Sequence, residues 1–148
     1  DNGGKLYTGS LYKKRKDVLS MYTEIRTWAA YRDYETVEEY AKGIGDAEIV
    51  LNLPSLSEAS NTRTFEVLAS RTALITPAMA YPDALFEHGK HLLYYKGSPA
   101  LAFEEAKSIF REIAWQGYEE VLKKHTIKHR LEEVLVSIHR PVRFHRSR

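Results

Sequence analysis

Short apolar runs alternate with segments of helical periodicity along this chain, and this alternation limits the possible folds more than any other feature. The clearest run, Glu48 to Leu53, is almost continuously apolar, a pattern typical of a strand that is covered on both faces. Shorter runs at about 5–8, 73–76 and 91–95 also indicate strands. Because alternating strands and helices favour a parallel sheet with right-handed crossovers, the sequence predicts the α/β class, with helices flanking a short, mostly parallel sheet.

The segments between these runs carry apolar residues at helical spacing. Thr36 is a suitable N-cap for one such segment, and Ser98 followed by Pro99 is a typical start for another. Pro141 ends the last stripe. We therefore expect helices at about 16–30, 37–45, 61–70, 99–122 and 131–138, with the C-terminal helices packed on the sheet.

The length and composition suit one globular domain. The 148 residues are enough for a real core, and we assign residues 1–140 to the domain and residues 141–148 to a basic C-terminal tail. No stretch approaches the roughly 20 apolar residues of a membrane span, and the N-terminus lacks a signal-peptide core, so we expect a cytoplasmic protein. The absence of cysteine excludes disulfides, thiol catalysis and thiolate metal sites.

Basic residues concentrate in two places although the net charge is only +2. One is the run Lys13–Lys16, and the other is the tail after Ile138. We interpret the tail as a solvated terminus, with an anionic membrane or nucleic acid as the alternative partner. Nucleic-acid binding is not expected, since the aromatic residues lack the interleaved basic pattern of a base-stacking platform.

The histidines do not form a recognisable metal motif. His125 and His129 are four residues apart and would share a helical face, but no His-Glu-x-x-His arrangement or third carboxylate accompanies them. We interpret this pair as part of a polar helix face and predict no metal site. His88 and His91 flank Gly89, which indicates a turn.

Glu58 and Glu66 lie eight residues apart, just after the apolar run that ends near Leu53. A strand that leads through a turn into a helix is a place where parallel α/β sheets bind anions, because the helix N-terminus presents unpaired N–H groups. Carboxylates that flank such a site would accept hydrogen bonds from sugar hydroxyls. The site predicted here consists of Glu58, Ser60, Asn61, Thr62, Arg63 and Glu66. The alternative is an ordinary surface helix with solvated charges.

A second candidate segment follows the first expected strand. Gly9 would let a ligand approach the backbone, and Lys14 and Arg15 would neutralise a diphosphate. The alternative is a solvated basic start of a helix.

Several segments in order resemble one enzyme family. They are DAEIVLNLPS, the Glu-x7-Glu pair within SEASNTRTFEVLAS, LITPAMAYPDALFEHGKHLLYY and QGYEEVLKKHTIKHRLEEVL, preceded by YTGSLYKKR. This pattern resembles the C-terminal, donor-binding half of two-domain (GT-B type) glycosyltransferases, in particular the CgeB-like spore-maturation group. The resemblance implies a single Rossmann-like domain that binds a nucleotide-diphosphate sugar as donor for glycosyl transfer to an unknown acceptor.

The resemblance also implies roles for the candidate residues. Glu66 would bind the ribose hydroxyls. Glu58 and the amides that follow it would hold the donor sugar and the distal phosphate. Arg63, together with Lys14 or Arg15, would face the diphosphate. The resemblance implies no required cofactor. The catalytic residues stay unassigned, because in this family the usual base lies on the acceptor-binding half. Another domain or a second chain would supply that half. Arg71 stands where the family usually has glycine. The alternative function is a non-catalytic Rossmann-like subunit that binds a partner protein.

Overall fold

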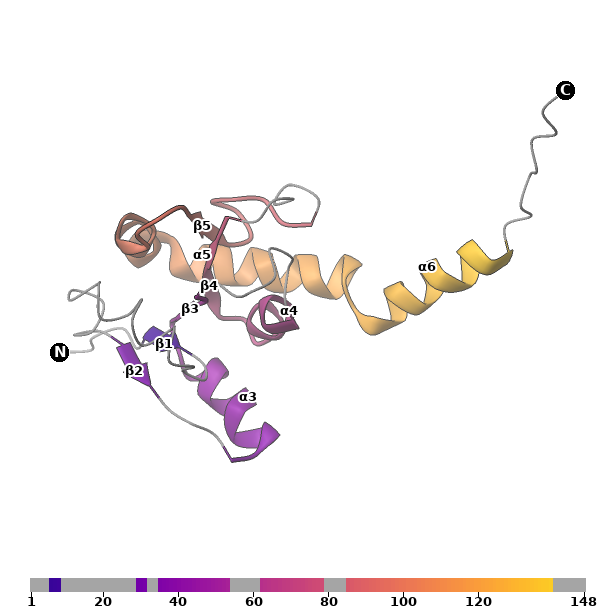
Figure 1. Cartoon of the computed structure of the whole chain (residues 1–148), viewed down its shortest axis with the longest axis horizontal. Coiled ribbons are helices and arrows are strands. Elements are labelled where there is room, and N and C mark those ends of the chain that lie inside the picture. Colours follow the sequence, from indigo (N-terminus) through magenta and orange to yellow (C-terminus); the bar gives the residue numbers. More distant parts are fainter. Residues whose placement is uncertain (1–5, 9–28, 32–34, 54–61, 79–84, 140–148) are drawn as a thin grey trace, which may run out of the picture.

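A computed structural model describes residues 6–8, 29–31, 35–53, 62–78 and 85–139 of the chain. Its centre is a five-stranded sheet in which each neighbouring pair of strands is parallel. The strands are β1 (Leu6–Thr8), β2 (Ala29–Tyr31), β3 (Ile49–Leu51), β4 (Ala73–Pro77) and β5 (Leu93–Tyr95). They are arranged in the order β2-β1-β3-β4-β5 (Figure 1). The α/β class and the parallel sheet are therefore confirmed.

Four helices are described: α3 (Val37–Gly45), α4 (Thr62–Ala69), α5 (Ala100–Lys124) and α6 (Ile127–His139). The predicted cap of α3 is confirmed, because Thr36 Oγ1 accepts a hydrogen bond from the Glu39 N–H at 3.1 Å. At the start of α5, the Ser98 hydroxyl accepts from the Ala100 N–H at 3.2 Å. In the described part of the chain, no helix combines the length and apolar character that crossing a membrane requires.

Both faces of the sheet are covered by helices. Alternate strand residues point to opposite faces, so Ile49 and Leu51 pack with the first half of α5, whereas Val50 packs with residues of α3 and α4. Val121, near the end of α5, belongs to the second of these clusters. Burial on both faces explains why β3 is a continuous apolar run, as the sequence suggested.

The expected helix at 16–30 is wrong at its end, where Ala29–Tyr31 form β2. This strand is three residues long, too short to show a period of its own, and its residues continue the helical spacing that precedes it. The rest of the expected helix lies outside the described residues.

The two C-terminal helices differ in how they pack. α5 lies on the sheet, whereas α6 runs away from it (Figure 1). The apolar stripe of α6 is consequently exposed, with 59% of Leu131, 54% of Val134 and 70% of Ile138 accessible to solvent. The predicted packing of the C-terminal region on the sheet is confirmed, and α5 makes this contact. The exposed stripe of α6 is a separate finding, since an amphipathic stripe predicts a helix and an apolar face but not what covers that face.

Candidate functional site

The sheet has a topological switch point between β1 and β3. From β1 the chain goes to β2 on one side, and it later returns to the other side of β1 as β3. Leu6 lies opposite Ile49 and Tyr7 opposite Val50, so the two strands end at the same edge of the sheet. Open parallel sheets bind ligands in the crevice outside the carboxyl ends of strands at such a point. The candidate site is therefore the edge beyond Thr8 and Leu51.

The nine candidate residues all follow β1 or β3 in the chain. Six lie outside the described residues: Gly9, Lys14, Arg15, Glu58, Ser60 and Asn61. The structure places the other three on α4, which begins at Thr62, within one residue of the predicted start. Arg63 is half-buried and Glu66 is exposed. The approach of Glu58 to Glu66 thus stays a prediction, while Arg63 and Glu66, three residues apart, share one face of α4.

A tyrosine on the neighbouring helix connects these two charged residues. The Tyr40 hydroxyl, from α3, donates a hydrogen bond to Glu66 Oε2 at 2.8 Å. The same hydroxyl oxygen accepts a hydrogen bond from Arg63 Nε at 3.3 Å. A cation, a phenol and a carboxylate therefore form one hydrogen-bonded chain across α3 and α4. The sequence indicated Tyr40 as an apolar position of a helix and did not indicate this contact.

The surroundings keep the Tyr40 phenol protonated. Burial raises its pKa above the ordinary value of 10.0. The hydrogen bond from Arg63 acts in the opposite direction, and the Glu66 carboxylate adds to the increase. A protonated phenol matches the observed geometry, because an ionised carboxylate can only accept and a guanidinium can only donate.

Arg71 lies at the other end of α4 from the candidate site. Its backbone has a φ of 56°, in the left-handed region that favours glycine. Its guanidinium carbon lies 4.6 Å from the ring centroid of Trp115 and 4.9 Å from that of Tyr118, both on α5. Glycine adopts such a backbone without strain, which agrees with the glycine that the resemblance implies at this position. The Arg71 side chain is directed to α5 and not to the residues on the first turns of α4.

Polar residues also lie at the carboxyl ends of β3, β4 and β5. Asn52, directly after β3, donates from Nδ2 to Thr76 Oγ1 at 3.2 Å. The Tyr95 hydroxyl, at the end of β5, donates to the Asn52 carbonyl oxygen at 3.0 Å. All three are buried and connect the ends of β3, β4 and β5. Sequence reasoning missed them, although an asparagine inside the apolar run before Leu53 was the available signal.

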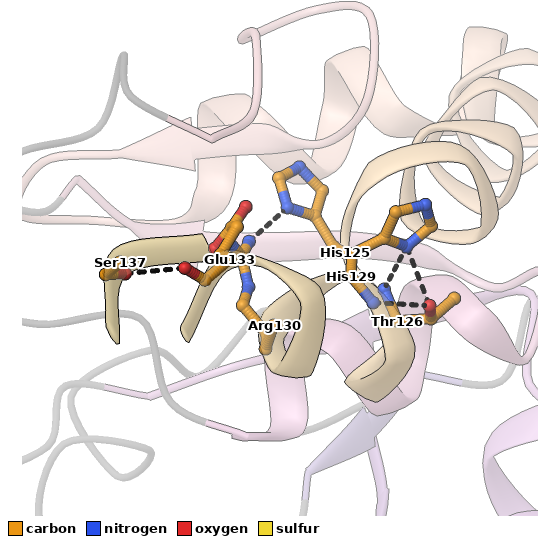
Figure 2. Close-up of polar contacts among 6 residues, drawn as sticks. All are labelled: His125, Thr126, His129, Arg130, Glu133 and Ser137. Atoms are coloured by element: carbon orange, nitrogen blue, oxygen red, sulfur yellow. Dashed lines mark hydrogen bonds and ion pairs between the residues drawn. The ribbon is translucent and has the colours of Figure 1, made fainter. Parts of the chain in front are cut away.

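The two histidines at the junction of α5 and α6 contact different partners (Figure 2). Arg130 donates to His125 Nδ1 at 2.6 Å and also binds Glu133 at 2.8 Å. His129 Nδ1 accepts from the Thr126 N–H at 3.3 Å, and the His129 N–H points back to Thr126 Oγ1, as in a capping box. These contacts are those of a polar helix start. Within the ranges that the structure describes, no three potential ligands among His, Asp and Glu lie together as a metal would need.

Comparison with known proteins assigns the chain to a family. A family model described as glycosyl transferase-like matches residues 9–136. The chain belongs to this family. No curated protein and no solved structure matches it.

The glycosyl transferase-like match begins directly after β1 and continues through most of α6. It therefore includes both segments that follow the switch-point strands, together with α4. This membership supports the glycosyltransferase part of the resemblance that the sequence showed. In this glycosyl transferase-like domain, the hydrogen bonds of Tyr40 with Arg63 and Glu66 join α3, which precedes β3, to α4, which follows β3.

Proposed function

We propose that the chain is the donor-binding half of a GT-B type glycosyltransferase of the CgeB-like group, and that it binds a nucleoside-diphosphate sugar. The observation that carries this proposal is that Arg63 and Glu66 share one face of α4, the helix that follows β3, and are joined through Tyr40. A cation and a carboxylate side by side suit a ligand that carries both phosphates and hydroxyls. Membership of a glycosyl transferase-like family supports the same class of chemistry.

In this proposal each candidate residue binds a distinct part of the donor. Glu66 accepts hydrogen bonds from the ribose hydroxyls, and Glu58 does so from the donor sugar. The amides of Ser60, Asn61 and Thr62 hold the distal phosphate at the start of α4. Arg63 faces the diphosphate together with Lys14 or Arg15, and Gly9 lets the ligand approach the backbone.

Catalysis by this half rests on positioning and electrostatics. The departing nucleoside diphosphate gains negative charge, and donors fixed in advance stabilise that charge in the transition state. Basic side chains and the helix N-terminus supply the compensating positive charge, so the proposal requires no cofactor or metal. The catalytic base and the acceptor site come from an acceptor-binding domain or a second chain.

A thermal-shift panel of UDP-, GDP-, ADP- and TDP-sugars, with the free diphosphates, tests the proposal. A ligand at about 100 times its Kd stabilises the fold by roughly 2.7 kcal/mol, which is about 5–10 °C for a domain of this size. We expect at least one nucleotide to give such a shift and Glu66→Ala to abolish it. Glu132→Ala, which removes an exposed carboxylate on α6, is the matched control and should keep the full shift. Equal shifts for wild type and Glu66→Ala would contradict the proposal.

The alternative, a non-catalytic subunit that binds a partner protein, is favoured by one observation, the exposed apolar stripe of α6. An unpartnered apolar face of this kind is a common mark of an interaction surface. The same panel separates the two functions, since a subunit of this type needs no nucleotide. Stabilisation by a nucleotide that depends on Glu66 contradicts the alternative.

A further inference from the structure

We propose that Tyr40 is a positioning residue of the nucleotide site, which holds the Glu66 carboxylate from α3 so that its second oxygen meets the ribose hydroxyls. This inference rests on the proposed function, in which Glu66 binds the ribose. It adds a residue on a different helix, 26 positions away from Glu66 in the chain.

The chemistry of the three groups fixes the direction of each hydrogen bond. Arg63 Nε can only donate, and an ionised Glu66 carboxylate can only accept. The hydroxyl of Tyr40 therefore receives one hydrogen bond and gives its single proton to Glu66 Oε2. Among the residues that the structure describes, Glu66 Oε1 has no hydrogen-bond partner, so this oxygen is left for a ligand hydroxyl.

An unassisted glutamate would be a poor partner for a ribose. Glu66 is exposed, and ordering a glutamate side chain costs up to about 1.5–2 kcal/mol of rotamer entropy. The hydrogen bond from Tyr40 orders the carboxylate before the ligand arrives, which lowers the cost of binding. The same hydroxyl orients Arg63, so the groups proposed for the ribose and for the diphosphate are held together.

The helix that carries Tyr40 is itself firmly attached to the domain. Ile44 of α3 is buried in the core, and the Thr72 hydroxyl donates to its carbonyl oxygen at 2.9 Å. At the other end, Thr36 caps the helix. Tyr40 is therefore placed by a rigid element, which a positioning residue requires.

Calorimetric titration tests the inference with UDP, GDP and ADP, each alongside its 2′-deoxy form. Tyr40→Phe keeps the ring and removes the hydroxyl, and Tyr118→Phe is the matched control on α5. We expect the wild type to prefer the ribose form, and Tyr40→Phe to lose about tenfold in affinity for it. The same substitution should lower the affinity for the 2′-deoxy form by a smaller factor, so that the preference for the ribose form decreases. Tyr118→Phe should leave both affinities unchanged.

The ratio of the two affinities separates positioning from folding. A variant that merely folds less well weakens both nucleotides equally and leaves the ratio unchanged, and that result would overturn the inference. If the wild type binds nucleotide and Glu66→Ala does not, while Tyr40→Phe matches the wild type, the role of Tyr40 is wrong and the proposed function stands. If the wild type binds none of these nucleotides, the proposed function fails, and the role of Tyr40 fails with it.

Discussion

At the scale of single residues, Gly117 shows how closely α5 approaches its neighbours. A Cβ atom built on Gly117 would lie 2.5 Å from the carbonyl oxygen of His91 and 2.8 Å from Leu68 Cδ2. We predict that Gly117→Ala lowers the free energy of unfolding by about 1–3 kcal/mol, because the backbone at His91 must move. Urea unfolding measures this change.

The control for this prediction is Gly45→Ala at the end of α3, where a Cβ meets no atom within 4 Å. This substitution should leave the free energy of unfolding unchanged or raise it by up to about 1 kcal/mol. Equal stability of the two variants would show that α5 does not pack against His91 as described.

The buried His91 and the half-buried His125 allow a prediction of how the free energy of unfolding depends on pH. Burial lowers the pKa of His91 and of His125, whose ring lies 5.0 Å from that of Phe86. In the unfolded chain a histidine titrates near 6.5, so below that pH the unfolded state binds protons that the folded state does not. We therefore predict that the free energy of unfolding falls as the pH is lowered from 7.5 to 5.5. Each of the two histidines contributes at most about 1.4 kcal/mol for each pH unit.

Urea unfolding at a series of pH values tests this slope. The double variant His91→Gln with His125→Gln should flatten it, whatever its own stability at pH 7.5. His88→Gln removes an exposed histidine and should preserve the slope. A wild-type free energy that rises toward pH 5.5 would contradict the burial of the two rings.

At the scale of elements, α5 and α6 carry similar apolar stripes and contribute differently to stability. Ile113 on α5 is 1% exposed, whereas Leu131 on α6 is 59% exposed. We predict that Ile113→Ala lowers the free energy of unfolding by about 2–5 kcal/mol and Leu131→Ala by less than about 0.5 kcal/mol. Urea unfolding at low protein concentration compares them, and a loss at Leu131 as large as that at Ile113 would mean that α6 is packed.

The sequence predicted elements better than it predicted contacts between them. The apolar run around Val50 and the cap at Thr36 each depend on neighbouring residues, and both predictions are confirmed. The strand Ala29–Tyr31 was missed because three residues carry too little periodicity. The link between Tyr40 and Glu66 joins two helices, and chain order alone does not show that these helices lie side by side.

At the scale of the whole molecule, the strand order explains how distant segments serve one site. Because β1 and β3 are neighbours, the segments that follow them leave the sheet at one edge, although they are separated by some 40 residues of chain. The sequence indicated both segments as candidate ligand sites but could not show that their strands pair. Hydrogen bonds that set strand order are made between residues far apart in the chain, which periodicity does not record.

The most direct test of the central claim, a nucleotide site at the edge beyond β1 and β3, is a map of amide chemical shifts during titration with UDP, GDP and ADP. We predict that the amides that move most with a bound nucleotide lie in residues 9–15 and 58–66, with smaller shifts around Tyr40. Shifts confined to α6 or to residues 141–148 would contradict the claim.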